Sequence, residues 1–206
     1  GLGGDDLTRS IAWDLGTMGI IKRLCAHYGC GAHIAGVSRL VIDMNREPDA
    51  PGLIPVVSDG TIIMGNEHLS AAERKSRVET YYAPYHARLG DIMHRLKHDP
   101  LVISLHSFTP KPMTGDARAT DIGLLTKHDM PSAKAFTAAM QKSAPEMQVD
   151  INLPYSAHDL NYTVDAHVAP HGHRHLAIEM RQDHVDSDRK EACMTEILIA
   201  ALTPLL

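Results

Sequence analysis

The stretch LVISLHSFTP, residues 101–110, joins a short apolar run to a histidine. The run Leu101–Leu105 predicts a strand that is buried on both faces, as in a parallel sheet. His106 follows directly and is a candidate metal ligand, because imidazole is the side chain that binds metals most often. A packed core histidine that bonds a backbone carbonyl is the alternative, and the strand context alone favours neither.

The segments before this strand predict one helix, one strand and a long loop. Asp5 and Asp6 are candidate N-caps of a helix that ends near Tyr28–Gly29. A strand-like segment covers Ala32–Val37, and a short apolar run follows it. Residues 47–66 hold several prolines and glycines and predict a long ordered loop, of a length that is usually functional. The apolar stripe of the predicted helix consists of Leu7, Ile11, Leu15, Met18, Ile21 and Cys25.

Further helices and strands are expected on both sides of residues 101–110. Ser70 and Glu73 have the spacing of a capping box and begin a helix that continues to about Leu96, with a kink at Pro84. The remaining predicted elements are a helix at about 131–142, strands at 149–153 and 176–180, and a last helix at about 187–202.

This alternation indicates an α/β fold with three layers, in which helices cover both faces of a mixed, mainly parallel sheet. In such sheets ligands bind beyond the carboxyl ends of the strands, which is where His106 is expected. A length of 206 residues fits a single domain, residues 1–206. The chain begins at Gly1 without a methionine, so we expect the natural sequence to begin further upstream.

Composition excludes several classes of function. The net charge of −5, without a long basic stripe, and the aromatic content of 4% argue against a nucleic-acid partner. No apolar run is long enough for a membrane span, and no secretory signal is visible. Three cysteines without a CxxC pair are typical of reduced thiols in the cytoplasm. The 14 histidines favour metal or acid–base chemistry.

The segment SRLVIDMNR, residues 38–46, places charged groups around a short apolar run. Arg46 offers a planar fork for a substrate carboxylate, and Arg39 is placed to polarise a scissile carbonyl. The alternative is that Asp43 forms a structural ion pair with one of these arginines, and without further context this alternative is favoured.

The segment HLAIEMRQD, residues 175–183, places Glu179 inside a strand-like run. Burial between apolar neighbours would raise the pKa of this carboxyl toward the range of a general base. Arg181 lies two residues on and shares a face of the strand, so the two charges would otherwise compensate each other.

Two further patterns are less specific. The alternating histidines at 167, 171, 173 and 175 lie near Pro and Gly and predict mainly a solvated loop, with secondary metal binding left open. The stretch YYAPYH, residues 81–86, favours helix packing over a cofactor site.

Together these segments resemble the N-formylglutamate amidohydrolase family. The matching stretches, in the family's order, are IAWDLG, SRLVIDMNR, SDGTIIMGN, YYAPYH, ISLHSFTP, NLPYS and IEMRQD. The resemblance implies a fold like that of the zinc carboxypeptidases and aspartoacylases, with one catalytic zinc ion. It also implies two further zinc ligands from just after a first strand, which we expect to lie upstream of Gly1.

The resemblance implies a role for each candidate residue. His106 is expected to be a zinc ligand, and Glu179 the base that acts on zinc-bound water. Asn45 and Arg46 are expected to bind the substrate carboxylate, with Arg39 at the carbonyl. Relatives carry Arg-Pro-Trp-His where this chain reads ARATDIG, so only Arg118 matches there as a substrate-binding residue.

The expected function is therefore zinc-dependent hydrolysis of a small acidic N-acyl amino acid, with N-formyl-L-glutamate as the leading substrate. Such a reaction belongs to histidine degradation. The alternative is a metal-free ligand-binding or regulatory protein that has kept the pocket and lost catalysis.

Overall fold

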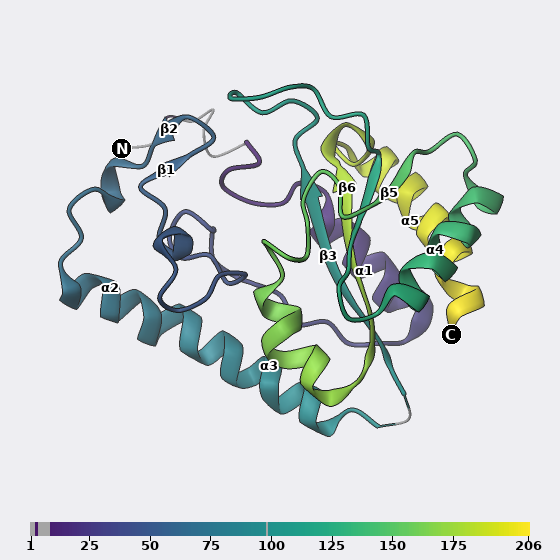
Figure 1. Cartoon of the computed structure of the whole chain (residues 1–206), viewed down its shortest axis with the longest axis horizontal. Coiled ribbons are helices and arrows are strands. Elements are labelled where there is room, and N and C mark those ends of the chain that lie inside the picture. Colours follow the sequence, from purple (N-terminus) through teal and green to yellow (C-terminus); the bar gives the residue numbers. More distant parts are fainter. Residues whose placement is uncertain (1–2, 4–8, 98) are drawn as a thin grey trace.

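The computed structural model describes Gly3 and residues 9–97 and 99–206. Its centre is a four-stranded sheet in the order β3-β6-β4-β5 (Figure 1). A separate two-stranded hairpin, β1 and β2, lies away from this sheet in Figure 1. The strands are β1 Val57–Ser58, β2 Thr61–Ile62, β3 Leu101–Phe108, β4 Ile122–Leu125, β5 Val149–Ile151 and β6 Arg174–Arg181.

The central sheet is mixed and mostly parallel. The pairs β3–β6 and β4–β5 are parallel, whereas β4 and β6 are antiparallel. Five α-helices accompany the sheet within the described residues: α1 Thr17–Tyr28, α2 Ala71–Arg77, α3 Ala83–Arg95, α4 Met130–Ser143 and α5 Asp188–Leu202. The predicted α/β class with a mainly parallel mixed sheet is therefore confirmed.

One face of the sheet packs against α1, α4 and α5 (Figure 1). Alternate strand residues point to this side because successive side chains on a strand face opposite ways. Fully burying one such side chain stabilises the fold by about 1.5–3 kcal/mol. The strand residues in this core are Leu101, Ile103, Leu105, Ile122, Leu124, Val149, Ile151, Leu176, Ile178 and Met180.

The opposite face of β3 is covered by α3 and by the π-helical segment Val164–Val168. Leu89 and Met93 from α3 form a second cluster with Val164 and Val168, and Val102 of β3 packs against it. His106 and Glu179 lie on this same side of the sheet, opposite the main core. The alternation of the strands therefore turns polar residues away from the apolar core.

The first helix begins later than expected. It starts at Thr17, after turns at residues 9–16, and the predicted N-caps Asp5 and Asp6, with Leu7, lie outside the described residues. Gly16 adopts a left-handed conformation with φ of 76° and lies directly against Val185, so a side chain would collide there. This turn sets the helix phase, and the buried residues of α1 are Ile20 and Leu24 rather than the predicted Met18, Ile21 and Cys25. The predicted end at Tyr28, followed by Gly29, is confirmed.

Three predictions about extended segments need correction. Residues 32–37 form no strand and are mostly exposed, because no neighbouring strand in the described part of the chain pairs with them. The loop 47–66 contains the hairpin β1–β2 and two helical turns, Pro51–Leu53 and Met64–Asn66. The strand predicted at Leu101–Leu105 exists, but it is half-buried, since β3 pairs only with β6 within the described residues.

The long helical stretch after Ser70 begins where it was predicted, but its helix type changes before Pro84. The capping box between Ser70 and Glu73 is present. The π-helical segment Val78–Tyr82 then joins α2 to α3, and Pro84 lies in the first turn of α3. Proline has no N–H group to donate the usual backbone hydrogen bond of an α-helix. The change from π-helix to α-helix therefore lies next to the position where that hydrogen bond is missing.

The later elements agree with the sequence. Helices α4 and α5 and strands β5 and β6 occupy the predicted segments within a few residues. Short helical turns complete the chain at Ala169–His171, Gln182–His184 and Thr203–Leu205. None of the helices in the described ranges combines the length and the apolar character that a membrane span requires.

Candidate active site

A small polar cavity of about 140 Å³ lies at the carboxyl ends of β3 and β6. Its position follows the rule that ligands of α/β sheets bind beyond the carboxyl ends of strands. The lining residues include five of the six predicted site residues, namely Arg39, Asn45, Arg46, His106 and Glu179. Tertiary structure thus brings together residues that are up to 140 positions apart.

His106 and Glu179 are direct partners in the register of β3 and β6. Neighbouring strands lie about 4.8 Å apart, so the two side chains leave the sheet side by side on the same face. Both line the cavity, and Glu179 is 9% exposed. A histidine and a buried carboxyl group therefore face one small space.

Asp14 connects this pair to Arg39. Its Oδ2 lies 2.7 Å from Nδ1 of His106, and its Oδ1 lies 2.9 Å from a terminal nitrogen of Arg39. The Asp14 carbonyl accepts a hydrogen bond of 2.8 Å from the Thr17 hydroxyl, which ties it to the first turn of α1. Sequence reasoning missed Asp14, because this residue fell inside the predicted first helix and its partner His106 lies 92 positions away.

The three ionisable groups set one another's charge. Burial opposes the charged form of His106, but the hydrogen bond and the charge of Asp14 outweigh it and raise the pKa of His106 to about 9. Burial also opposes the charge of Asp14, yet Arg39 and His106 hold the pKa of Asp14 below its usual value. For Glu179, burial dominates and raises its pKa to about 7, although His106 and Arg39 oppose the shift. The buried carboxyl group predicted from the apolar neighbours of Glu179 is thus present.

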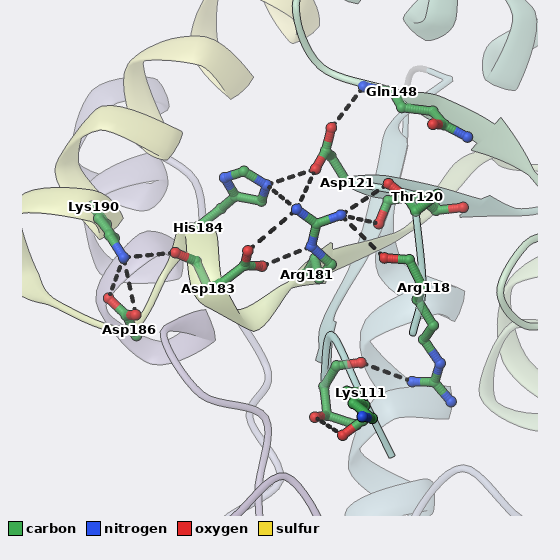
Figure 2. A network of polar contacts seen from close by, with 12 residues as sticks. Lys111, Arg118, Thr120, Asp121, Gln148, Arg181, Asp183, His184, Asp186 and Lys190 are labelled. Atoms are coloured by element: carbon green, nitrogen blue, oxygen red, sulfur yellow. Dashed lines mark hydrogen bonds and ion pairs between the residues drawn. The ribbon is translucent and has the colours of Figure 1, made fainter. Parts of the chain in front are cut away.

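Arg181 is not the ion-pair partner of Glu179. Figure 2 shows the Arg181 guanidinium enclosed by other groups. It lies 2.7 Å from both Asp121 and Asp183 and donates to the carbonyl of Ala119 at 2.8 Å. Glu179 and Arg181 therefore do not compensate each other's charge, although their spacing on the strand allowed it. Arg181 is bound by the groups at the end of β6, and Glu179 faces the cavity.

The segment that holds Asn45 and Arg46 is fixed by its own hydrogen bonds. The Asn45 side-chain oxygen accepts from the Thr163 amide at 2.9 Å, and Asp43 accepts from the Asn45 amide at 2.9 Å. Within the described ranges no hydrogen bond involves Nδ2 of Asn45, so this group is a donor available to a ligand. Arg46 forms one long ion pair, with 3.7 Å between its Nε and Oδ2 of Asp43. The predicted structural pairing of Asp43 with one arginine is present, but it uses only the inner edge of the Arg46 fork.

Arg118 lies beside the cavity rather than among its lining residues. Its guanidinium carbon lies 4.7 Å from the centre of the Tyr155 ring and 5.6 Å from that of Phe108, and both rings line the cavity. It also donates to the carbonyl of Thr109 at 3.1 Å. In Figure 2 the Arg118 side chain extends away from the Arg181 network. A cation held on two aromatic rings is stabilised at this wall of the cavity.

Tyr155 reaches the cavity through the segment NLPYS, residues 152–156. Asn152 has a left-handed backbone with φ of 57°, and its side chain bonds both the amide and the carbonyl of Thr126. Gly123 is the position where this segment crosses β4. A Cβ atom there would collide with the Leu153 carbonyl and lie 3.4 Å from the Glu179 side chain. The glycine therefore allows the segment to pass close to the sheet.

The alternating histidines separate in the structure. His167 faces His86, with 2.8 Å between their ring nitrogens, and His171 stacks on His173 at 5.5 Å between ring centres. His175 lies in β6 and is buried, so the predicted solvated loop is wrong at this position. The predicted packing role of YYAPYH is confirmed by the buried Tyr82 and His86.

The metal-binding capacity of the site is incomplete in the described part of the chain. His106 supplies an imidazole at the cavity, but no group of three or more His, Cys, Asp or Glu side chains in residues 9–97 and 99–206 is arranged to hold a metal ion. A catalytic zinc site usually needs three protein ligands. His106 therefore fits as one ligand of such a site, and the described residues do not complete it.

Comparisons with known proteins show the fold and the family of this chain. The structure is similar to that of gene product Atu2144 from Agrobacterium tumefaciens, with a TM-score of 0.87, 30% identity, and coverage of 100% of this chain and 83% of that one. It also shares the fold of N-formylglutamate amidohydrolase from Ralstonia eutropha JMP134, with a TM-score of 0.56, 21% identity, and coverage of 81% and 72%. No curated protein matches the sequence. The model of the N-formylglutamate amidohydrolase family matches residues 1–185, and the chain belongs to this family.

Proposed function

We propose that the protein hydrolyses the amide bond of a small acidic N-acyl amino acid, and that its substrate is N-formyl-L-glutamate. The products would be formate and L-glutamate. The observation that carries this proposal is the pairing of His106 with the buried Glu179 in a cavity that also presents Arg39, Asn45 and Arg46. Membership of the amidohydrolase family supports the same reaction class.

Glu179 is proposed as the general base. It accepts a proton from the water molecule that attacks the acyl carbon, and then returns the proton to the nitrogen of the leaving amino acid. Its carboxyl group suits this role because it is buried, faces the cavity and has no hydrogen-bonded or ion-paired partner within the described residues. A positioned base of this kind contributes typically about 10²–10⁴-fold to the rate.

Asn45 and three arginines are proposed to bind the substrate. Asn45 and Arg46 would bind a carboxylate of the substrate, since the outer edge of the Arg46 fork and Nδ2 of Asn45 remain available. Arg39, held by Asp14, would donate to the acyl oxygen as negative charge develops there. Arg118 is proposed to contact the substrate from its position on Tyr155.

His106 is proposed as a zinc ligand. Within the described residues no group of three or more candidate ligand side chains is arranged to hold the ion, so no step above depends on it. Zinc, when bound, would polarise the acyl carbonyl and activate water. We also propose that the single domain has the zinc-carboxypeptidase-like arrangement that the resemblance implies.

The test is an assay of formate release by the purified protein, with and without added Zn²⁺. The substrates are N-formyl-L-glutamate and N-formyl-L-glutamine, which has the same size but lacks the side-chain charge. Faster turnover of the acidic substrate supports the proposal. Calorimetric binding of N-formyl-L-glutamate without formate release would instead support a ligand-binding protein, and equal turnover of both substrates would overturn the acidic specificity.

A further inference from the structure

Two of the three cysteines lie next to each other at the end of α1, away from the cavity. Cys25 is in the last turns of this helix, and Cys30 follows the left-handed Gly29 that ends it. Their sulfur atoms are 3.9 Å apart. The reversal of the chain at Gly29 therefore folds the second thiol back onto the first.

The two thiols differ in their access to solvent. Cys30 is exposed, whereas Cys25 is partly buried. Burial, reinforced by the neighbouring Cys30, raises the pKa of the Cys25 thiol. The accessible Cys30 is therefore the first to meet an oxidant, and Cys25 lies in position to react with it afterwards, since reactivity follows access and thiolate character.

The chain around Cys30 leaves room for the sulfurs to approach. A Cβ atom added at Gly29 or at Gly31 would meet nothing within 4 Å, so there is open space beside both neighbours of Cys30. Bond formation requires the sulfurs to move from 3.9 Å to about 2.05 Å. Rotation of the exposed Cys30 side chain can bring about such a movement without disturbing the core.

We propose that Cys25 and Cys30 form a redox-sensitive site that a hydroperoxide such as hydrogen peroxide converts reversibly to a disulfide. The Cys30 thiolate attacks one peroxide oxygen, the O–O bond breaks, and Cys30 becomes a sulfenic acid as hydroxide leaves. The Cys25 thiolate then attacks the Cys30 sulfur, forms the S–S bond and displaces a second hydroxide. Each hydroxide takes up one of the two thiol protons, so two thiols and one peroxide give one disulfide and two molecules of water.

The disulfide would join the end of α1 to the start of the loop that follows it, residues 30–37. The other side of this helix end is already fixed, because the Tyr28 hydroxyl donates to the Ile199 carbonyl of α5 at 3.2 Å. Closing a short loop on an anchored helix end removes freedom from the unfolded chain. Oxidation is therefore expected to raise the melting temperature slightly and to leave the distant cavity unchanged.

The chain offers a matched control in Cys193, which is also exposed but lies on α5 without a neighbouring cysteine. Purified protein is treated with one equivalent of hydrogen peroxide, alkylated, digested with trypsin and analysed by mass spectrometry. Leu24–Arg39 is one tryptic peptide that holds both cysteines. The expected product is this peptide without alkylation and lighter by two hydrogen atoms. Dithiothreitol should restore both thiols. Cys193 should still be alkylated.

Two variants sharpen the result. In Cys25→Ser, oxidation should stop at a Cys30 sulfenic acid that dimedone traps, whereas Cys193→Ser should form the disulfide as fast as wild type. The proposal would be overturned if the wild type gave a Cys30 sulfinic acid and no disulfide-containing peptide, or if Cys193 were oxidised before Cys30. Thiol counts in guanidinium confirm that each protein starts fully reduced, and circular dichroism confirms that each variant is folded.

Discussion

The carboxylate of Asp14 lies 2.7 Å from Nδ1 of His106, although 92 residues separate the two in the sequence. The contact links the turn before α1 to the end of β3. Because the same carboxylate also binds Arg39, a change at Asp14 reaches two candidate site residues at once. A carboxylate that holds a histidine in this way fixes which ring nitrogen carries the proton and how the ring is oriented.

Asp14→Asn should weaken zinc binding and activity by about 10–100-fold, as is typical when the partner of a metal-binding histidine is lost. The amide keeps the size of the side chain but removes the charge that orients His106 and Arg39. Zinc titration by calorimetry and steady-state kinetics measure the two effects. Asp188→Asn is the control, because Asp188 also pairs with an arginine but is exposed. If the two variants behave alike, Asp14 has no role at the site.

His106→Ala should lower the zinc content of the purified protein. The prediction rests on the position of His106 at the end of β3 and on the wall of the cavity. Elemental analysis of wild type and variant measures it directly. His27→Ala removes an exposed histidine of α1 and should leave the zinc content unchanged. Equal zinc in all three proteins would remove His106 from the proposed ligand set.

Glu179→Gln should lower kcat by about 10²–10⁴-fold while zinc content and melting temperature change little. Glutamine keeps the shape of the side chain but cannot accept the proton from water. Since Arg181 pairs with Asp121 and Asp183, the substitution leaves no arginine without its partner. Glu196→Gln on the exposed side of α5 is the control. An active but less stable Glu179→Gln protein would show that the carboxyl group is structural.

Arg46→Ala should raise KM for an acidic substrate far more than for a neutral acyl amide. Loss of a charge-assisted contact in a desolvated site costs about 2–5 kcal/mol. Kinetics with N-formyl-L-glutamate and with an uncharged N-formyl amide give the two values. Arg95→Ala at the exposed end of α3 controls for the general loss of positive charge. Equal losses on both substrates would assign Arg46 to the structural pair with Asp43.

Acidification should destabilise the fold through the pair His86 and His167. Burial and then the neighbouring His167 lower the pKa of His86 to about 4, and burial also lowers the pKa of His167. Between an unfolded-state value of 6.5 and about 4, the unfolded chain binds a proton that the folded His86 does not. The free energy of unfolding should therefore fall as the pH falls through this window, by about 1–2 kcal/mol near pH 5 for one such group.

Guanidinium unfolding at neutral pH and near pH 5 measures this loss. His86→Phe keeps an aromatic ring beside Tyr82 and should show a smaller loss than wild type. His27→Phe, on the exposed side of α1, should lose as much stability as wild type. An unchanged loss in His86→Phe would show that other groups cause the acid sensitivity.

Local signals in the sequence were sufficient for much of the fold. The capping box at Ser70, the proline that begins α4 and the apolar run of β6 act through nearest neighbours, so their elements were predicted. The strand predicted at residues 32–37 was wrong, because a strand requires a neighbouring strand and local composition does not supply one. The predicted start of α1 was wrong, because the turn before the helix depends on the contact of Gly16 with Val185.

The sequence by itself determined which chemical groups the candidate site contains: a histidine after an apolar strand, a carboxyl group between apolar neighbours, and two arginines that flank a short apolar run. Only the tertiary structure decided their partners. The register of β3 and β6 sets Glu179 beside His106, and the turn before α1 brings Asp14 to both His106 and Arg39. Charge states and ion pairs depend on distances between side chains, and chain segments far apart in sequence acquire such distances only when the sheet closes.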